Sequence, residues 1–164
     1  MIEVKPANAE ELVIIHQLAH EIWPSAYLEI LGQEQLDYML DKIYSIPSLQ
    51  QQATVLHHRF IILFENSVPA GFASYSPHED NFVYHLNKIY VLPSCQGKSL
   101  GKELLKYVVT QVKKTGATSL QLNVNRYNKA LHFYEKQGFK IIREEDIDIG
   151  SGYFMNDYVM ELQF

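Results

Sequence analysis

The sequence predicts a mixed α/β fold with a largely antiparallel central sheet, and two patterns support this class. Apolar segments of strand length dominate the middle and the end of the chain, and helical patterns are interleaved between them. A strand, a helix and a second strand also follow one another over residues 82–124, which is the size of a right-handed crossover between parallel strands. We therefore expect roughly six to seven strands, one parallel pair among them, flanked by about four helices.

The N-terminal third reads as one short strand followed by two helices. The strand covers Ile2–Pro6, and Asn8 is a suitable N-cap for the first helix. Apolar residues recur at helical spacing up to Trp23-Pro24, where we expect that helix to end. A second apolar stripe, 36–43, predicts the second helix. The pattern of residues 48–57 favours neither a helix nor a strand.

The middle of the chain changes to extended segments. The apolar run Phe60–Phe64 and the segment Val68–Tyr75 are separated by the turn residues Glu65-Asn66-Ser67, which predicts a β-hairpin. A further strand over Phe82–Leu92 leads through a glycine-containing loop into a helix with its apolar stripe over 100–112. This strand and helix open the predicted crossover.

The C-terminal third completes the predicted sheet. Leucine and valine alternate with polar residues over 119–124, which predicts the strand that closes the crossover. A helix over Asn125–Gln137 is stopped by Gly138. The segments 139–149 and 153–163 then form a closing hairpin around a glycine-rich turn.

Composition limits the classes of function. The 164 residues, 47% hydrophobic and 20% charged, suit one compact domain over 1–164. Fourteen basic against 19 acidic residues give a net charge of −5 without any basic run, so we expect no nucleic-acid partner. The longest apolar runs are too short for a membrane helix and the N-terminus lacks a leader pattern, which predicts a cytoplasmic protein with no membrane partner. A lone cysteine, Cys95, cannot form an internal disulfide.

The first motif with chemical content is the loop Leu92-Pro93-Ser94-Cys95-Gln96-Gly97-Lys98-Ser99-Leu100-Gly101-Lys102. A glycine-containing loop that opens directly into a helix presents free backbone N–H groups beside the positive end of the helix dipole, which suits a phosphate. The P-loop of nucleotide-binding proteins is a poor match, because Leu92 stands where that motif needs a glycine. Taken alone, the loop is equally consistent with glycines used only for turning.

A second motif is Asn128-Lys129-Ala130-Leu131-His132-Phe133-Tyr134-Glu135-Lys136-Gln137-Gly138-Phe139. Together, the strand, the Gln-x-x-x-x-Gly loop, the helix, the next strand and this Asn-x-Ala-x-x-Phe-Tyr-Glu-Lys-x-Gly-Phe segment closely resemble the two linked motifs of the GNAT superfamily of acyl-CoA N-acyltransferases. The resemblance covers Leu86 to Phe139, and the remaining predicted elements follow in the order of that fold.

The resemblance implies acetyl-CoA as co-substrate, held in a gap where the two parallel strands splay apart. The pantetheine arm would pair with the backbone of Ile89, Tyr90 and Val91 like an extra strand, and the N–H near Val91 would hold the oxyanion. Asn128 would also hold the arm. The loop residues implied to bind the pyrophosphate are Gln96, Gly97, Lys98, Ser99, Leu100 and Gly101. Lys102 and Lys136 are candidates to pair with phosphates, although exposed lysines are usually only solvated.

One position departs from the family pattern. The family's loop usually reads Gln/Arg-x-x-Gly-x-Gly/Ala, and its middle glycine is Ser99 here. Serine still offers its N–H and adds a hydroxyl, but it lacks the freedom that allows a close backbone approach. We therefore expect a modest cost in affinity for the cofactor.

Two proton-transfer roles follow from the chemistry. The resemblance implies that Tyr134 protonates the departing thiolate, since a tyrosine of pKa about 10 can donate to a thiol of pKa about 8 to 9. The alternative is simple packing beside Phe133. For the base that takes the amine proton, His85 on the strand flanking the thioester is the first candidate and Glu79 a weaker one. His16 and His20 lack a third ligand, so we expect no metal.

The acceptor is the least determined part of the prediction. The resemblance places Trp23, Tyr27 and Tyr38 near the acceptor pocket, where aromatic walls would suit an amine, but core packing explains them equally well. Three functions remain open: an N-acetyltransferase that acts on a small primary amine by direct attack in a ternary complex, a protein or peptide N-acetyltransferase, and a non-catalytic acyl-CoA-binding module. The acidic excess leans towards a cationic acceptor. Family members also often form homodimers.

Overall fold

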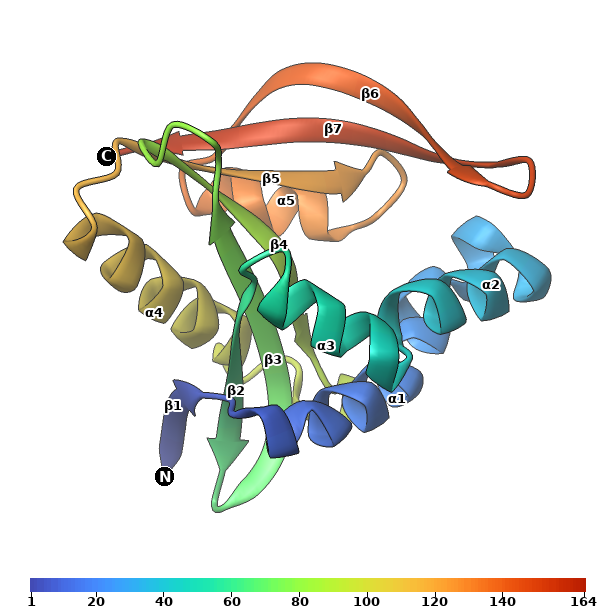
Figure 1. Ribbon diagram of the computed structural model, residues 1–164, viewed down its shortest axis with the longest axis horizontal. Coiled ribbons are helices and arrows are strands. Elements are labelled where there is room, and N and C mark those ends of the chain that lie inside the picture. The colour runs from blue at the N-terminus through green and yellow to red at the C-terminus, as the bar shows by residue number, and fades with distance from the viewer.

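A computed structural model describes all 164 residues and shows one seven-stranded mixed sheet in the order β1-β2-β3-β4-β5-β7-β6 (Figure 1). Only β4 and β5 pair in parallel, and every other neighbouring pair is antiparallel. The predicted fold class and the single parallel pair are therefore confirmed. The strands are β1 Ile2–Pro6, β2 Arg59–Glu65, β3 Val68–Pro77, β4 Val83–Val91, β5 Ser119–Asn125, β6 Lys140–Gly150 and β7 Tyr153–Gln163.

Five α-helices accompany the sheet, one more than expected. They are α1 Leu12–Leu31, α2 Gln33–Tyr44, α3 Ile46–Thr54, α4 Leu100–Lys114 and α5 Ala130–Lys136, with short 3-10 turns at Ala9–Glu11 and Pro93–Cys95. The additional helix is α3, in the segment whose pattern favoured no structure. The Ser45 hydroxyl caps it by accepting from the Ser48 N–H at 3.3 Å, and Pro47 fits its first turn. None of the helices is long and apolar enough to cross a membrane.

Helix α1 does not end at Pro24, contrary to the prediction. It continues to Leu31 and stops at Gly32, whose φ of 79° only glycine adopts easily and whose N–H donates to Leu28 O at 2.9 Å. Proline removes one helical hydrogen bond, but Trp23 and Tyr27 on either side are both buried. Burial of two large aromatic side chains outweighs the lost bond, and the longer helix carries Tyr27 over the sheet.

Helix α5 begins later than predicted, at Ala130. Two asparagine side chains fold the preceding residues into turns: Asn125 Oδ1 accepts from the Tyr127 N–H at 3.0 Å, and Asn128 Oδ1 accepts from the Ala130 N–H at 2.9 Å. Side-chain amides compete in this way with helical bonding. The turn fixes Asn128 at the start of α5.

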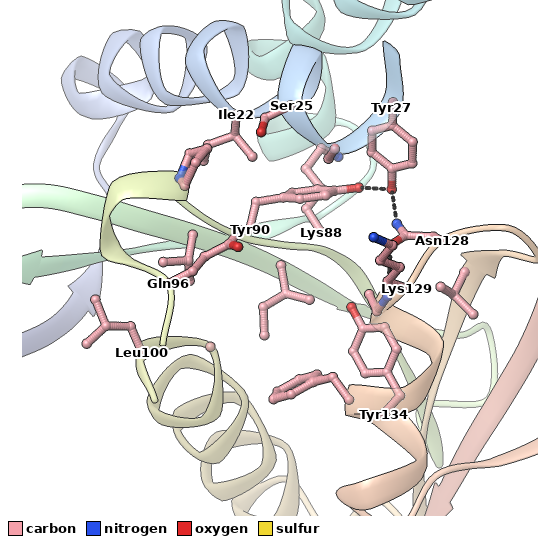
Figure 2. A pocket seen from close by; sticks show the side chains of 18 of the residues that line it. Ile22, Ser25, Tyr27, Lys88, Tyr90, Gln96, Leu100, Asn128, Lys129 and Tyr134 are labelled. Atoms are coloured by element: carbon pink, nitrogen blue, oxygen red, sulfur yellow. Dashed lines mark hydrogen bonds between the residues drawn. The ribbon is translucent and has the colours of Figure 1, made fainter. Parts of the chain in front are cut away.

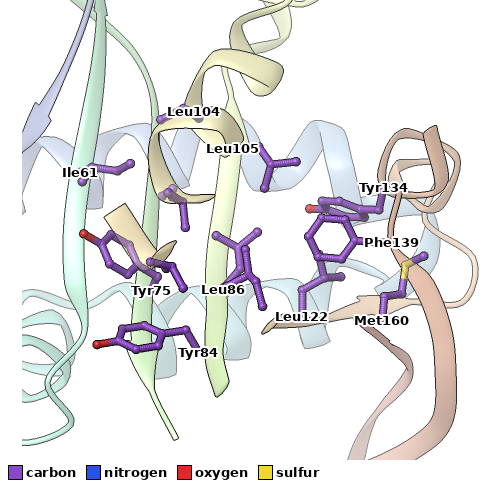
Figure 3. Close-up of a cluster of buried hydrophobic side chains, with 14 of the residues drawn as sticks. Ile61, Tyr75, Tyr84, Leu86, Leu104, Leu105, Leu122, Tyr134, Phe139 and Met160 are labelled. Carbon is purple, nitrogen blue, oxygen red and sulfur yellow. The ribbon is translucent and has the colours of Figure 1, made fainter. Parts of the chain in front are cut away.

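The sheet has an apolar cluster on each face. One cluster joins the sheet to α4, α5 and the segment after α5, and includes Leu104, Leu122 and Phe139 (Figure 3). The other joins the opposite face to α1, α2 and α3, and includes Trp23 and Phe72. In Figure 1, α4 lies apart from the N-terminal helices, with the strands between them. The sheet is therefore held from both sides.

The parallel strands stay paired only at one end. Pairing runs from Val83 with Ser119 to Leu86 with Leu122 and then stops. Directly beyond it, Ser74 of β3 pairs with Lys88 whereas Tyr75 pairs with Leu86, so Asn87 is an extra residue, a β-bulge in β4. The bulge bends β4 away from β5 while β4 keeps its pairing with β3. The gap between the two strands begins here.

Candidate active site

The gap between β4 and β5 opens into a cavity of about 710 Å³ (Figure 2). Its walls come from the second half of α1, the bulged end of β4, the loop before α4, the first turn of α4, β5 and the start of α5. A cavity of this size and mixed lining is large enough for an extended ligand.

The loop before α4 provides backbone donors at one side of the cavity. Gly97 and Ser99 both have left-handed backbones, with φ of 83° and 63°, which turns the chain sharply into the helix. Hydrogen bonding of α4 starts with the Glu103 N–H, which donates to Ser99 O at 3.1 Å. The backbone N–H groups of residues 97–102 have no carbonyl partner within the protein. Such a run of free donors at a helix N-terminus binds anions, phosphate above all.

The open edge of β4 offers a second set of backbone groups. The Leu92 N–H donates to Ala70 O on β3 at 2.8 Å, and Tyr90 pairs with Phe72. Because backbone groups point alternately to the two sides of a strand, those of Ile89 and Val91 face the gap. An extended ligand can pair with them as an added strand would.

Tyr134 of α5 is nearly buried and lines the cavity. Its ring packs at 67° to that of Phe139 in the core cluster, and its hydroxyl points up towards the cavity and makes no hydrogen bond to the protein (Figure 2). Burial raises the pKa of Tyr134 well above its ordinary value, and the nearby Tyr27 adds to the shift. The hydroxyl therefore stays protonated at neutral pH and is free to donate.

Three side chains from different elements meet above Tyr134. The Tyr27 hydroxyl from α1 lies 2.9 Å from that of Tyr90 on β4, and the Asn128 amide donates to it at 3.3 Å (Figure 2). Burial raises the pKa of Tyr27, so its hydroxyl remains neutral. Asn128, which the resemblance assigned to the cofactor, is therefore held in position by its hydrogen bond to Tyr27 of α1.

Lys88 also lines the cavity and is only 7% exposed. Its ammonium donates to Gln52 Oε1 of α3 at 2.5 Å and lies 5.7 Å from the ring centre of Tyr44, without a carboxylate partner. Burial lowers the pKa of Lys88 to about 7. A buried amine of this kind exchanges protons near neutrality.

Most of the residues predicted for the cofactor lie around this one cavity. Those that line it are Ile89, Tyr90, Val91, Gln96, Gly97, Ser99, Leu100, Gly101, Lys102, Asn128 and Tyr134, together with Tyr27 from the acceptor set. Lys98 and Lys136 are not part of the lining, and Lys98 instead pairs with Glu65 at 3.2 Å. The ion pair engages only the side chain of Lys98, and its backbone N–H remains one of the free donors of the loop.

His85, the first candidate for the base, does not line the cavity. It precedes the bulge, in the paired part of β4, and its ring stacks on that of His78 at 5.7 Å. Burial, with His78 beside it, lowers the pKa of His85 to about 4, which makes it a weak base. Glu79 lies exposed in the loop after β3.

Two of the three aromatic residues predicted for the acceptor lie elsewhere. Trp23 is buried in the cluster beneath α1, where its ring contacts those of Tyr27 and Tyr44. Tyr38 contacts Tyr153 at 5.3 Å and donates to Ile149 O at 2.8 Å, so it joins α2 to the terminal hairpin. The core interpretation of these two side chains fits their positions.

Sequence reasoning missed several residues that line the cavity, chiefly Asn87, Lys88, Asn123 and Lys129. Lys129 lies inside the second motif and could have been proposed with it. Asn123 alternates with apolar residues on β5, so a polar side chain on the non-core face was visible in the pattern. Lys88 gave no such signal, because only the bulge turns its position towards α3.

An anion-binding loop, a splayed parallel pair that accepts an extended arm, and a buried tyrosine hydroxyl define an enzyme of the acyl-CoA transferase class. Comparison with known families agrees. The sequence model of the Acetyltransferase (GNAT) family matches residues 14–139, and the chain belongs to this family of acyl-CoA N-acyltransferases.

Similar proteins include enzymes with different acceptors. The chain is 28% identical to the spermidine N(1)-acetyltransferase of Thermoplasma acidophilum over 99% of its own length and 98% of the relative's. It is 36% identical to the [ribosomal protein bS18]-alanine N-acetyltransferase of Haemophilus influenzae, over 56% of this chain and 58% of that one. Both relatives are N-acetyltransferases.

The fold agrees with solved structures of the family. The PaiA N-acetyltransferase of Thermoplasma acidophilum, solved in complex with coenzyme A, superposes with a TM-score of 0.83 at 28% identity, covering 100% of this chain and 99% of that one. A GCN5-related N-acetyltransferase from Rhodopseudomonas palustris gives the same TM-score at 17% identity, over 99% and 95% of the two chains.

Proposed function

We propose that this enzyme transfers the acetyl group of acetyl-CoA to a primary amine of a small molecule, by direct attack within a ternary complex. The observation that carries the proposal is the cavity, in which free N–H groups at the start of α4 and the open edge of β4 lead to the Tyr134 hydroxyl. An anion site, a strand-like channel and a proton donor in this order match the pyrophosphate, pantetheine and thioester of acetyl-CoA.

The chemistry assigns a role to each end of the channel. The amine nitrogen attacks the thioester carbon, the C–N bond forms, and the carbonyl oxygen takes the negative charge, which the Val91 N–H stabilises. When the C–S bond breaks, the sulfur leaves as a thiolate and Tyr134 supplies its proton. No histidine or aspartate lines the cavity, and the one carboxylate in its lining, Glu29, takes the proton of the amine directly or through water. Tyr134 recovers its own proton from solvent.

A small amine is favoured over a peptide as acceptor. The relative aligned along nearly the whole chain is named as a spermidine acetyltransferase, whereas the alignment with the bS18-alanine enzyme covers only 56% of this chain. That shorter match keeps a protein N-terminus as the second candidate. A panel of small amines and peptides, followed by release of free thiol from acetyl-CoA, separates the two.

Gly101 offers a direct test of cofactor binding. A Cβ at this position would lie 3.7 Å from the Phe133 ring, an ordinary contact, so Gly101→Ala should bind acetyl-CoA as the wild type does. The longer side chain of Gly101→Leu would meet Phe133 and Val91 and fill the anion site. We expect calorimetric titration to show at least about a tenfold weaker binding for Gly101→Leu, equivalent to 1.4 kcal/mol.

The matched pair separates a specific site from general disturbance. Equal affinity of wild type, Gly101→Ala and Gly101→Leu would contradict binding at the α4 loop. Loss of binding in both variants, accompanied by a lower melting temperature, would point to helix packing instead. Thiol release that requires an added amine would then establish transfer.

A further inference from the structure

One buried carboxylate on the sheet has no counter-ion. Asp157 of β7 is only 5% exposed, and its Oδ1 has no hydrogen-bond partner. Its other oxygen, Oδ2, accepts only a long bond of 3.3 Å from the Asn123 amide. A buried, half-satisfied carboxylate costs stability, so its presence calls for an explanation beyond packing.

The surroundings of Asp157 add negative charge. Glu145 of β6 lies directly opposite Asp157, an arrangement of like charges that destabilises a sheet. Asn123 bridges the two carboxylates, donating to Glu145 Oε2 at 3.4 Å as well. Arg143 bonds to the far oxygen of Glu145 at 2.8 Å, and Arg126 pairs with Asp146 and Glu144. Arg126 reaches Asp157 only at its backbone oxygen, so the carboxylate keeps its charge unpaired.

Asp157 lies directly behind the cavity wall. It is not itself part of the lining, but Asn123, its only side-chain donor, is. Asp157 pairs with Asn125 across β5, so it shares with Asn123 the sheet face opposite the α4 cluster. Burial is the main cause of the raised pKa of Tyr27, and the charge of Asp157 adds to it.

We propose that Asp157 receives the ammonium group of a cationic aliphatic amine and so selects the acceptor. The inference rests on the proposed amine acetylation. An ammonium carries three donors and a full charge, whereas the Asn123 amide gives Asp157 one long, neutral bond. A cation held close to Asp157 balances its charge and relieves the repulsion between Asp157 and Glu145. Asp157 thus acts as a specificity-determining residue.

The test compares Asp157→Asn, which removes the charge at constant shape, with Glu145→Gln as the matched control. Two primary amines are assayed: 1,4-diaminobutane, which is cationic at pH 7.5, and aniline, which is neutral there. For Asp157→Asn we expect KM for 1,4-diaminobutane to rise about 10- to 100-fold, with unchanged acetyl-CoA affinity and unchanged turnover of aniline. Glu145→Gln, whose carboxylate already has Arg143, should change KM less than about threefold.

Stability distinguishes this role from a structural one. Removing a buried unpaired charge should leave the melting temperature of Asp157→Asn unchanged or raise it. A lower melting temperature with equal losses for both amines would overturn the proposal, as would an unchanged KM for 1,4-diaminobutane.

The proposal stays testable if no amine is acetylated. Calorimetric titration of the coenzyme A complex with 1,4-diaminobutane measures binding alone. Binding by wild type that is lost in Asp157→Asn supports the ammonium site even if the proposed transfer fails. Absence of binding in wild type overturns the site, while acetyl-CoA binding is assessed separately through Gly101.

Discussion

Tyr134 combines deep burial with a hydroxyl that no protein group satisfies. Tyrosine hydroxyls usually find a partner when buried, so this one is available to a ligand. We predict that Tyr134→Phe lowers kcat about 100-fold or more, since a positioned acid contributes typically 10²- to 10⁴-fold. The acetyl-CoA affinity should stay the same, because the ring and its contacts are retained.

The control for this prediction is Tyr107→Phe on α4, a partly buried tyrosine outside the cavity. Its kcat should equal that of the wild type. If Tyr134→Phe also kept full kcat, packing beside Phe133 would be the role of Tyr134. Steady-state kinetics with saturating amine and acetyl-CoA make the comparison.

Single residues also mark the limit of sequence reasoning. The two motifs placed Asn128 and Tyr134 at the cavity, because local spacing fixes their helix and loop. The position of Lys88 depends on Gln52, 36 residues away, and that of Asp157 depends on Glu145, 12 residues away. A pattern along one strand carries no information on which charge lies across the sheet. The stacking of His85 on His78 was out of reach for the same reason, because it requires the register of β3 and β4.

At the scale of elements, the loop and first turn of α4 hold a serine in a conformation that favours glycine. Ser99 has φ of 63° and ψ of 22°, a left-handed geometry that costs a non-glycine residue about 1–2 kcal/mol. Replacing Ser99 by glycine removes this strain, but glycine loses more conformational entropy on folding, which offsets about half of the stabilisation. We predict that Ser99→Gly raises the free energy of unfolding by about 0.5–1 kcal/mol, measured by urea titration.

The same substitution bears on the cofactor. The sequence suggested that Ser99 weakens the loop, yet its backbone already adopts the glycine-like geometry and its N–H is free. Ser99→Gly should therefore tighten acetyl-CoA binding by less than about tenfold. A larger gain would mean that the serine side chain itself obstructs the phosphate.

Element boundaries were predicted well where a strong local signal ends the segment and poorly where tertiary packing decides. Gly138 and the turn at 150–152 bounded their elements correctly. Pro24 did not, because burial of Trp23 and Tyr27 carries α1 past it. Helix α3 has too weak an apolar stripe to be read alone, and it is held by Leu49 in the apolar cluster and by the hydrogen bonds of Gln52 to Ile43 O and Lys88.

At the scale of the whole molecule, Lys88 couples folding to pH. Its pKa is about 7 when folded and near 10.5 when unfolded, so the unfolded chain binds more protons between these values. The contribution of Lys88 to the free energy of unfolding therefore rises as the pH increases from 7 to 10. Below pH 7 the group is protonated in both states and this pH-dependent contribution is absent. We predict that wild type gains on the order of 1–3 kcal/mol across this range relative to Lys88→Met.

Urea unfolding of wild type and Lys88→Met at pH 7, 8.5 and 10 measures the difference. Lys98→Met is the control, because its side chain is half exposed rather than buried. If the free energy of unfolding changed with pH in the same way for wild type and Lys88→Met, the lowered pKa of Lys88 would be contradicted. Lys98→Met should follow the wild type throughout.

The divergence of β4 from β5 has a consequence for what can enter the protein. Unpaired strand edges on a protein surface recruit other strands and promote aggregation. Here the unpaired edge lies inside the sheet, between α1 on one side and the first turn of α4 on the other. A thin unbranched chain has no side chains on its two faces, so it suits such a channel better than a peptide strand does. The fold thus offers the unpaired edge of β4 to a slender ligand inside the cavity and keeps the same edge away from the outer surface, where it could pair with other strands.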